Sequence, residues 1–370
     1  MIPNRLFICI LMFGFFSTNA QEVRKYSNDF LSIGVGARGL AMSNAQVASV
    51  EDVSAGYYNP AGLAWITNAF QLGAMHAEYF GGVAKYDYAS FAVPIMQQSR
   101  TLGFSFIRFG VDNIPNTLNL FNADGSIDYD NIRSFSVGDY GIYLHYAQKI
   151  KIPKGELSIG GSPKFVYRKA GTFANSLGFG IDLGLQFRYK GFKFGFMGRD
   201  LSSTFNAWKF TFNEDEKKVL TQTGNVLPVT SLEITAPRLW FGFAYEYKFK
   251  KIFRIQPEIN FDLSTDGKRN VLVQGNPISM DLNAGLELSF VDIVYLRAGV
   301  GNIQRSTDDL GNKITTVQPN IGAGLGYKGY VRVDYAYTDI GDQSDALYSH
   351  VVSLQIGINK GKKSNTEFKE

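Results

Sequence analysis

Residues 177–189 read LGFGIDLGLQFRY, so apolar residues alternate with glycine, charged or amide residues at every position. Successive side chains of a β-strand point to opposite faces. This stretch therefore presents Leu, Phe, Ile and Tyr on one face and Gly, Asp, Gln and Arg on the other. One face suits lipid and the other a wet lumen, which is the pattern of a strand in a transmembrane β-barrel.

The same alternation recurs in residues 192–197 and 239–248, which read FKFGFM and LWFGFAYEYK. A soluble β-sandwich also alternates, but we expect its outer rim to be less aromatic. Candidate strands begin near Ala69, Tyr86, Thr101, Asp139, Gly155, Ser176, Phe192, Arg238, Ile252, Asp281, Ile293, Thr315, Tyr330 and Leu347. We therefore predict an all-β fold, a fourteen-stranded antiparallel transmembrane β-barrel.

The predicted connections alternate between tight turns and long polar loops. The turns fall at residues 151–154, 190–191, 250–251, 291–292 and 328–329, and the loops at residues 111–138, 202–237, 264–280 and 303–314. Outer-membrane barrels have short periplasmic turns and longer extracellular loops. The alternation predicts that both termini are periplasmic and that the long loops face outward.

The ends of the chain define three further segments. Residues 1–20 contain Arg5, an apolar run and a small residue at Ala20, as a secretory signal peptide does. The single cysteine, Cys9, lies in this leader, so neither a disulfide framework nor a cysteine metal cluster is indicated. We assign residues 21–66 to an N-terminal periplasmic or plug segment, 67–359 to the barrel and 360–370 to a polar periplasmic tail.

Charged residues occupy the predicted inner face of several strands. Mixed charges inside a narrow barrel can pair, so we expect an ion-pair network that fills the lumen rather than a selective ion path. The candidate lumen charges are Asp182, Arg188, Glu246, Arg254, Glu258, Asp262, Glu287, Arg297, Arg332 and Asp334.

The sequence indicates no catalytic, cofactor or metal site. His76, His145 and His350 lie far apart without neighbouring ligands at metal-binding spacing. Residues 34–39 read GVGARG, but they lack the strand and helix context of a dinucleotide-binding turn. The net charge of +4 is mild and implies no nucleic-acid partner. We predict a protein that is not an enzyme and has no cofactor.

Aromatic residues cluster in the longest predicted loop. They invite a protein partner, although aromatics spaced by two near a barrel rim also extend strands or form an interfacial girdle. These candidate partner-binding residues are Phe205, Trp208, Phe210 and Phe212.

Two motifs precede the first predicted strand. One contains Gly36, Ala37 and Arg38, and the other is the turn Asn59, Pro60, Ala61 and Gly62. With fourteen strands behind them, they resemble the PorV/PorQ family of outer-membrane proteins and, more distantly, the FadL fatty-acid transporter family. The resemblance implies that the segment to about residue 66 folds back to plug or line the periplasmic end of the barrel.

The resemblance also implies partners. PorV-like proteins serve the type IX secretion and sorting system, where extracellular loops receive the C-terminal signal domains of cargo. We therefore expect an outer-membrane barrel that contacts outer-membrane lipid and binds the type IX translocon or its cargo. The alternative is a FadL-like channel for hydrophobic compounds, which predicts a hydrophobic ligand in an apolar pocket between the plug and the outer half of the barrel.

Overall fold

The computed structural model describes residues 27–359 except 123, 225, 228–229, 251, 308–311 and 341–348. The predicted signal peptide and polar tail lie outside these residues. Within the described part of the chain, no helix is long and apolar enough to cross a membrane.

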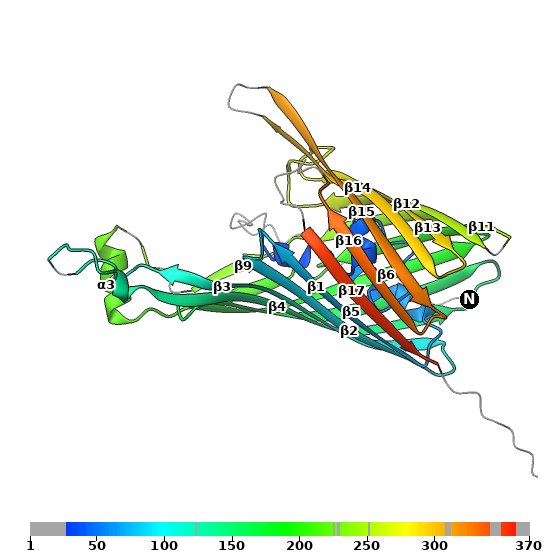
Figure 1. The fold of residues 1–370 in the computed structure, drawn as a ribbon, viewed down its shortest axis with the longest axis horizontal. Coiled ribbons are helices and arrows are strands. Elements are labelled where there is room, and N and C mark those ends of the chain that lie inside the picture. The colour runs from blue at the N-terminus through cyan, green and yellow to red at the C-terminus, as the bar shows by residue number, and fades with distance from the viewer. Residues whose placement is uncertain are drawn as a thin grey trace, which may run out of the picture.

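Fourteen antiparallel strands form a closed barrel (Figure 1). Each strand pairs with the next along the wall, and β1 closes the barrel against β17, from Phe70 opposite Ile358 to Glu78 opposite His350. The wall strands are β1 (Phe70–Tyr79), β2 (Ala84–Ile95), β3 (Arg100–Asn116), β4 (Arg133–Ile150), β5 (Glu156–Ala170), β6 (Ala174–Tyr189), β7 (Phe192–Arg199), β10 (Arg238–Tyr245) with its continuation β11 (Tyr247–Phe249), β12 (Phe253–Ser264), β13 (Ser279–Phe290), β14 (Val294–Thr307), β15 (Lys313–Tyr327), β16 (Val331–Thr338) and β17 (Ser349–Ile358).

The tight turns gather at one end of the barrel, which we call the short-turn end. Lys190 and Gly191 both have positive φ, 49° and 85°, as the two central residues of a tight hairpin turn require. The opposite, long-loop end carries the longer connections, together with two short ones at residues 80–83 and 171–173. The predicted order of tight turns and long loops along the chain therefore matches the order in which the barrel strands are connected.

Three of the predicted loops are partly regular structure. Residues 202–237 contain β8 (Phe205–Phe210), α3 (Glu214–Gln222) and β9 (Thr230–Ile234). β3 continues to Asn116, and β4 begins at Arg133 rather than near Asp139; β14 and β15 likewise extend into residues 303–314. The prediction was wrong here because these extensions lie beyond the apolar belt, where alternation of lipid-facing residues is not required.

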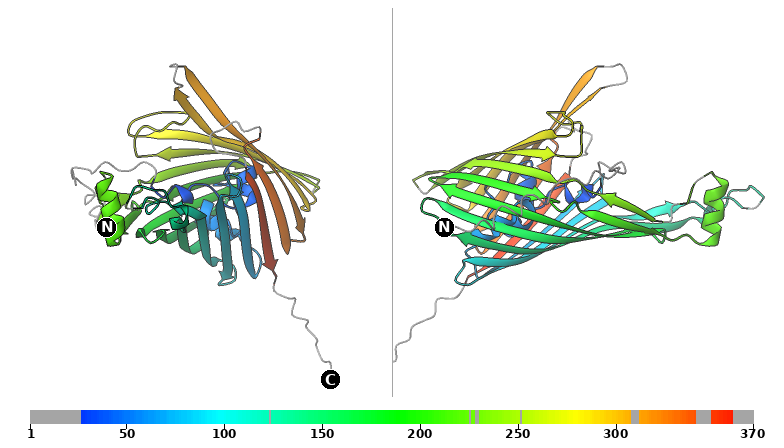
Figure 2. Two further views of the ribbon diagram at one scale, coloured as in Figure 1. Left: turned by 60° about the vertical axis from the view of Figure 1, so that its left-hand side comes forward. Right: turned by 180° about the vertical axis from the view of Figure 1, so that it is seen from behind.

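The extensions form an arm beyond one side of the barrel. The upper half of β6 pairs with β8 instead of β7, and β8 pairs with β9. β3, β4 and these strands run outward together, with α3 near the outer end of the arm, while the hairpin of β14 and β15 projects separately (Figures 1 and 2). The start of the nine-residue helix α3 is stabilised by a reciprocal capping box between Asn213 and Glu216.

The remaining helices are short. They are η1 (Asp29–Leu31), α1 (Ala37–Ala41), α2 (Ala55–Tyr58), η2 (Pro60–Trp65) and η3 (Tyr129–Asn131). All but η3 belong to residues 27–66, which lie inside the barrel (Figure 2, blue). We call residues 27–66 the inner segment. Almost every residue from Val35 to Ala64 is buried, so this segment and not a water-filled channel occupies the middle of the lumen.

Candidate functional site

The inner segment rests directly on glycines of the barrel wall. A Cβ atom at Gly195 of β7 would lie 2.2 Å from the carbonyl oxygen of Val47, and one at Gly299 of β14 would lie 2.4 Å from the carbonyl carbon of Met42. No larger residue leaves room for backbone at these distances. The inward-facing glycines that touch the inner segment in this way are Gly73, Gly160, Gly184, Gly195, Gly242, Gly285, Gly299 and Gly322. These inward-facing glycines therefore form a surface on which the inner segment packs, and we call this surface the glycine bed.

The Asn-Pro-Ala-Gly turn is fixed against this bed. The Asn59 side chain donates to the carbonyl oxygens of Val47 at 2.9 Å and Leu185 at 3.0 Å, and accepts from the backbone N–H of Ala61. Pro60 and Ala61 lie against Gly160, and a Cβ at Gly62 would meet the carbonyl oxygen of Val50 at 2.4 Å. The motif thus joins the segment to itself and to β6 within one turn.

The first motif docks on the other side of the lumen. The backbone N–H of Ala37 donates to Ser353 Oγ at 3.0 Å, and that of Gly36 points to the sulfur of Met75. The Arg38 side chain donates to Glu287. Together the two motifs anchor the segment to β1, β6, β13 and β17.

An apolar cluster fills the half of the lumen nearer the long loops. Phe30, Leu31 and Tyr57 of the inner segment pack with Tyr86 of β2 and Ile107 of β3, all buried. Tyr57 and Tyr58 meet edge to face with centroids 4.9 Å apart. We call these five residues the apolar cluster, together with seven further buried residues that pack with them. The further members are Val35, Tyr58, Tyr88, Tyr143, Val166, Met197 and Trp240.

Arg199 lies fully buried beside this cluster. Its guanidinium lies 4.3 Å from the Tyr57 ring and 4.2 Å from the Trp240 ring. It donates to the carbonyl oxygens of Leu31 at 3.0 Å and Tyr57 at 2.9 Å. Cation–π contact and carbonyl acceptors thus stabilise a buried charge and link the wall to the inner segment.

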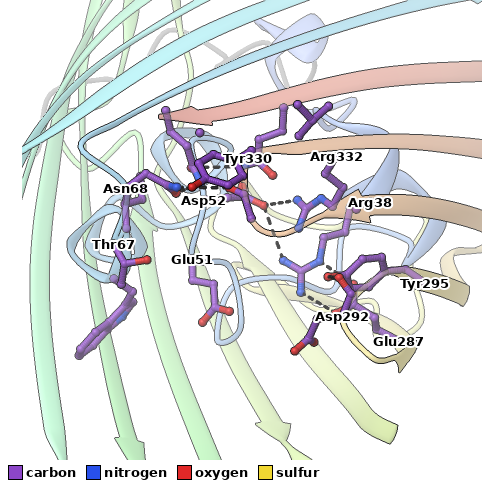
Figure 3. Close-up of a pocket in the computed structure, with 18 of the residues that line it drawn as sticks. Arg38, Glu51, Asp52, Thr67, Asn68, Glu287, Asp292, Tyr295, Tyr330 and Arg332 are labelled. Carbon is purple, nitrogen blue, oxygen red and sulfur yellow. Dashed lines mark hydrogen bonds and ion pairs between the residues drawn. The ribbon is translucent and has the colours of Figure 1, made fainter. Parts of the chain in front are cut away.

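A closed ring of ion pairs lies on the opposite wall. Figure 3 shows the part of it formed by Arg38, Asp52, Glu287 and Arg332. Six side chains of alternating charge join in the order Arg38, Glu287, Arg297, Asp334, Arg332 and Asp52. Successive contacts measure 2.8, 2.7, 2.7, 3.0 and 2.5 Å, and the ring closes from Asp52 to Arg38 at 4.0 Å. Arg38 and Asp52 come from the inner segment and the other four from β13, β14 and β16. We call this set the ion-pair ring.

Nearby cations of the wall and of the segment itself set the charge state of two acids of the inner segment. Burial alone would raise the pKa of the Asp52 carboxyl, but Arg332 and Arg38 overcome this and lower that pKa. For the neighbouring Glu51 carboxyl, burial is likewise outweighed by Lys193 and Arg188, which lower its pKa to about 2. Both acids are therefore ionised at neutral pH.

The other predicted lumen charges also face inward. Asp182 pairs with the buried Lys164 at 2.8 Å, and Asp262 pairs with Arg238. Glu258 accepts from the backbone N–H of Ala48 at 2.8 Å. Arg188, Glu246 and Arg254 lie near the short-turn end, around two adjoining cavities of about 450 and 410 Å³.

The predicted partner-binding aromatics lie on the arm and divide between its faces. Phe205 is exposed, whereas Trp208 and Phe210 stack with centroids 6.2 Å apart. Phe212 continues this row toward Phe173 at 6.3 Å. Strand extension therefore accounts for the spacing of two, and the charged residues that follow Phe212 form the first turns of α3.

Several interior residues were missed by the sequence analysis. Lys164, Lys193 and Arg199 share the inward parity of their strands, so alternation alone could have found them. Glu51 and Asp52 lie in irregular chain, where no periodicity marks a face. In the described residues, no group of three His, Cys, Asp or Glu is arranged to hold a metal ion.

Solved hydrocarbon channels share this architecture. The monoaromatic hydrocarbon channel CymD aligns with a TM-score of 0.56 at 13% identity, over 89% of this chain and 98% of CymD. The Pseudomonas putida toluene transporter TodX aligns with 0.52 at 14% identity, over 87% and 98%. The Ralstonia pickettii toluene transporter TbuX gives 0.54 at 11%, over 88% and 99%. At sequence identities this low, the similarity to these channels is a similarity of fold alone.

The chain therefore shares with these channels the fold of a closed, fourteen-stranded antiparallel β-barrel. No family model matches the sequence, and no curated protein does. The PorV/PorQ resemblance, with its type IX partners, is therefore supported by neither a family model nor a curated relative. The structural neighbours favour the alternative channel reading.

Proposed function

We propose that this barrel is a channel for small hydrophobic compounds and that the inner segment controls passage. The apolar cluster is the observation that carries the proposal. A lumen built only for ions or sugars has no use for a buried apolar cluster, whereas here Tyr57, Tyr86 and Ile107 pack together beside the ion pairs of the long-loop half. The fold that this barrel shares with the hydrocarbon channel CymD and the toluene transporters TodX and TbuX supports this choice.

Passage requires the inner segment to yield. The apolar cluster is closely packed, and beyond it the wall glycines and the ion-pair ring hold the segment across the lumen. A compound that enters from the long-loop end therefore meets an apolar contact surface first and a closed barrier next. We infer that residues 21–66 act as the plug, and that local displacement of this segment opens the path.

A disulfide lock tests this proposal. An ideal Cβ at Gly73 of β1 lies 3.8 Å from the Cβ of Val53, which is the usual Cβ separation in a disulfide. The double variant Gly73→Cys/Val53→Cys should therefore tie segment to wall. The only natural cysteine, Cys9, lies in the predicted leader and does not compete.

Cells that produce each variant are assayed for uptake of a radiolabelled monoaromatic hydrocarbon. We expect the oxidised double variant to lose uptake relative to the same variant in reductant, and uptake by the parent to respond to neither oxidant nor reductant. Undiminished uptake in the oxidised variant would refute control by the segment. Failure of the parent protein to raise uptake above an empty-vector strain would refute the channel itself.

The arm supports a second candidate function, recognition of a protein partner. Its strand β8 carries the exposed Phe205 and the start of the aromatic row at Trp208. The arm itself extends outward from the barrel (Figures 1 and 2). Exposed aromatics on a rigid extension are common binding anchors. By the PorV/PorQ resemblance, the partner would be the type IX translocon or a cargo C-terminal signal domain.

Replacement of Phe205 tests this second function. Phe205→Ala removes an exposed ring, whereas Leu232→Ala removes an exposed aliphatic group from neighbouring β9. If the arm binds cargo through its aromatics, only the first variant should reduce surface attachment of type IX cargo. Equal attachment in both variants and the parent would exclude this role for Phe205. We propose no enzymatic activity and no cofactor under either function.

A further inference from the structure

The short-turn end holds a cationic mouth that the channel function does not explain. The two adjoining cavities share Glu51, Arg188 and Arg254 in their linings. Together they are lined by eight Lys or Arg and six Asp or Glu residues. The mouth therefore carries a surplus of positive charge, although a hydrophobic compound gains nothing from cations.

Two guanidinium groups of the mouth are incompletely paired. Within the described residues, the buried Nε and Nη2 atoms of Arg188 and the buried Nε of Arg254 find no hydrogen-bond acceptor. Arg254 has carboxylates of Glu246, Glu287 and Asp292 around it, but only at 3.8, 3.7 and 3.5 Å. Arginine presents donors in a planar fork that matches the oxygens of a carboxylate or phosphate. The unpaired donors of Arg188 and Arg254 therefore lack the acceptor oxygens that a carboxylate or phosphate would supply.

Trp65 positions one side of the mouth. The Arg188 guanidinium lies 4.3 Å from the Trp65 ring centroid and the Lys149 ammonium 5.3 Å from it. The indole N–H donates to Gln186 Oε1 at 2.7 Å, which fixes the ring. No carboxylate lies within 4.0 Å of Lys149 among the described residues. The indole thus holds Arg188 in place and brings a second cation beside it.

Glu51 of the inner segment already pairs with some of these cations. Its carboxylate lies 2.9 Å from Arg188 and 3.8 Å from Lys193. Its side chain keeps 39% of its accessible surface, and Figure 3 shows it directed into the cavity. An oxyanion from solution can therefore reach the same cations, and it would compete with Glu51 for them.

We propose that the short-turn mouth is a binding site for an oxyanion group, a phosphate or a carboxylate, held by Arg188 and Arg254 in competition with Glu51. This site is independent of the channel function. The group can belong to a free anion or to the headgroup of an anionic lipid. Because Glu51 belongs to the inner segment, occupancy of the site also weakens one contact between that segment and the wall.

Calorimetric titration of the purified full-length barrel in neutral detergent tests the site. Inorganic phosphate serves as the free anion, and mixed micelles with phosphatidic acid present the lipid-borne group. We expect Arg188→Gln and Arg254→Gln each to weaken binding about tenfold or more, since each removes a charged donor. Glu51→Gln should tighten binding several-fold, because it removes the competing charge. A merely structural role for Glu51 would not produce that gain.

Lys248→Gln is the matched control. It deletes the same unit of charge from the rim of the mouth, at a side chain that is 61% exposed and paired with Glu246. It should change affinity less than about twofold, because an exposed charge acts through screened solvent. Heat-modifiable migration in gels verifies that each variant is folded.

The outcomes decide the proposal. Binding of phosphate assigns a free anion, and binding of phosphatidic acid alone assigns a lipid headgroup. Absence of saturable binding to both probes in the parent and in Glu51→Gln would overturn the site. Binding that Arg188→Gln and Lys248→Gln weaken equally would show an adventitious ion only, and would overturn it as well.

Discussion

The inner segment is held by two different kinds of contact on the two sides of the barrel. Toward β2, β3 and β10 it packs through aromatic and aliphatic groups of the apolar cluster. Toward β13, β14 and β16 it joins the ion-pair ring. Apolar packing follows the area removed from water, whereas buried ion pairs depend on geometry and on complete pairing.

The ring is built so that either half is balanced when alone. Its wall members Glu287, Arg297, Asp334 and Arg332 alternate in sign and carry no net charge, and Arg38 and Asp52 of the segment balance each other. Withdrawal of the segment would therefore leave no uncompensated charge on the wall. The ion-pair ring therefore permits the inner segment to leave the wall, whereas the packing of the apolar cluster opposes its departure.

Removal of a central charge of the wall should have the largest effect on stability. Arg297 is fully buried between Glu287 and Asp334, so Arg297→Met removes a contact from both and leaves the wall with two carboxylates against one guanidinium, that of Arg332. We expect a loss of about 3–5 kcal/mol in the free energy of unfolding, measured by urea titration in lipid vesicles. Arg38→Met should lower it less, because Glu287 keeps Arg297. Equal losses would contradict a self-sufficient wall.

A methyl group on the glycine bed should have the next largest effect. Gly195→Ala places a Cβ 2.2 Å from the Val47 carbonyl oxygen, so the inner segment must shift. We expect a loss of about 1–3 kcal/mol in unfolding free energy and faster proteolysis of the segment. Gly161→Ala is the control, because its Cβ meets only a Leu183 side chain at 3.1 Å. Similar proteolysis of both variants would argue against the bed.

Loss of one hydroxyl on the apolar side should have a smaller effect. Tyr57→Phe keeps the ring against Arg199 but removes the 2.7 Å hydrogen bond to the carbonyl oxygen of Leu31. We expect a loss of about 1–2 kcal/mol in unfolding free energy. Tyr189→Phe at the exposed outer face should change it by less than about 0.5 kcal/mol. A neutral Tyr57→Phe would show that this hydrogen bond does not secure the segment.

Acid should produce the smallest change, through the contact of Glu51 with Arg188 and Lys193. The pKa of Glu51 falls from 4.5 to about 2 in the fold, so its stabilisation is full above pH 4.5 and disappears as pH falls through 2. The difference between the parent and Glu51→Gln in protease release of the segment should be constant from neutral pH to about pH 5, then shrink. A difference that changes between pH 6 and 8 would show that another group titrates.

Alternation in the sequence predicted much of this architecture. It located the wall strands, the turns of the short-turn end and inward charges such as Glu287, Arg297 and Asp334, because each of these depends only on strand parity. The same reasoning failed for residues 202–237. There, β8 pairs with the upper half of β6, and such long-range pairing leaves no signal in local periodicity.

The sequence by itself determined a barrel with an apolar exterior, a glycine-rich and charged interior and two distinct ends. Only the tertiary structure decided what the interior contains. Parity assigns a residue to a face but cannot say which groups meet across the lumen, so it left open that Glu51 reaches Arg188 and that Val47 lies on Gly195. Those contacts join residues far apart in the chain, and they are fixed only when the closed wall holds the inner segment in three dimensions.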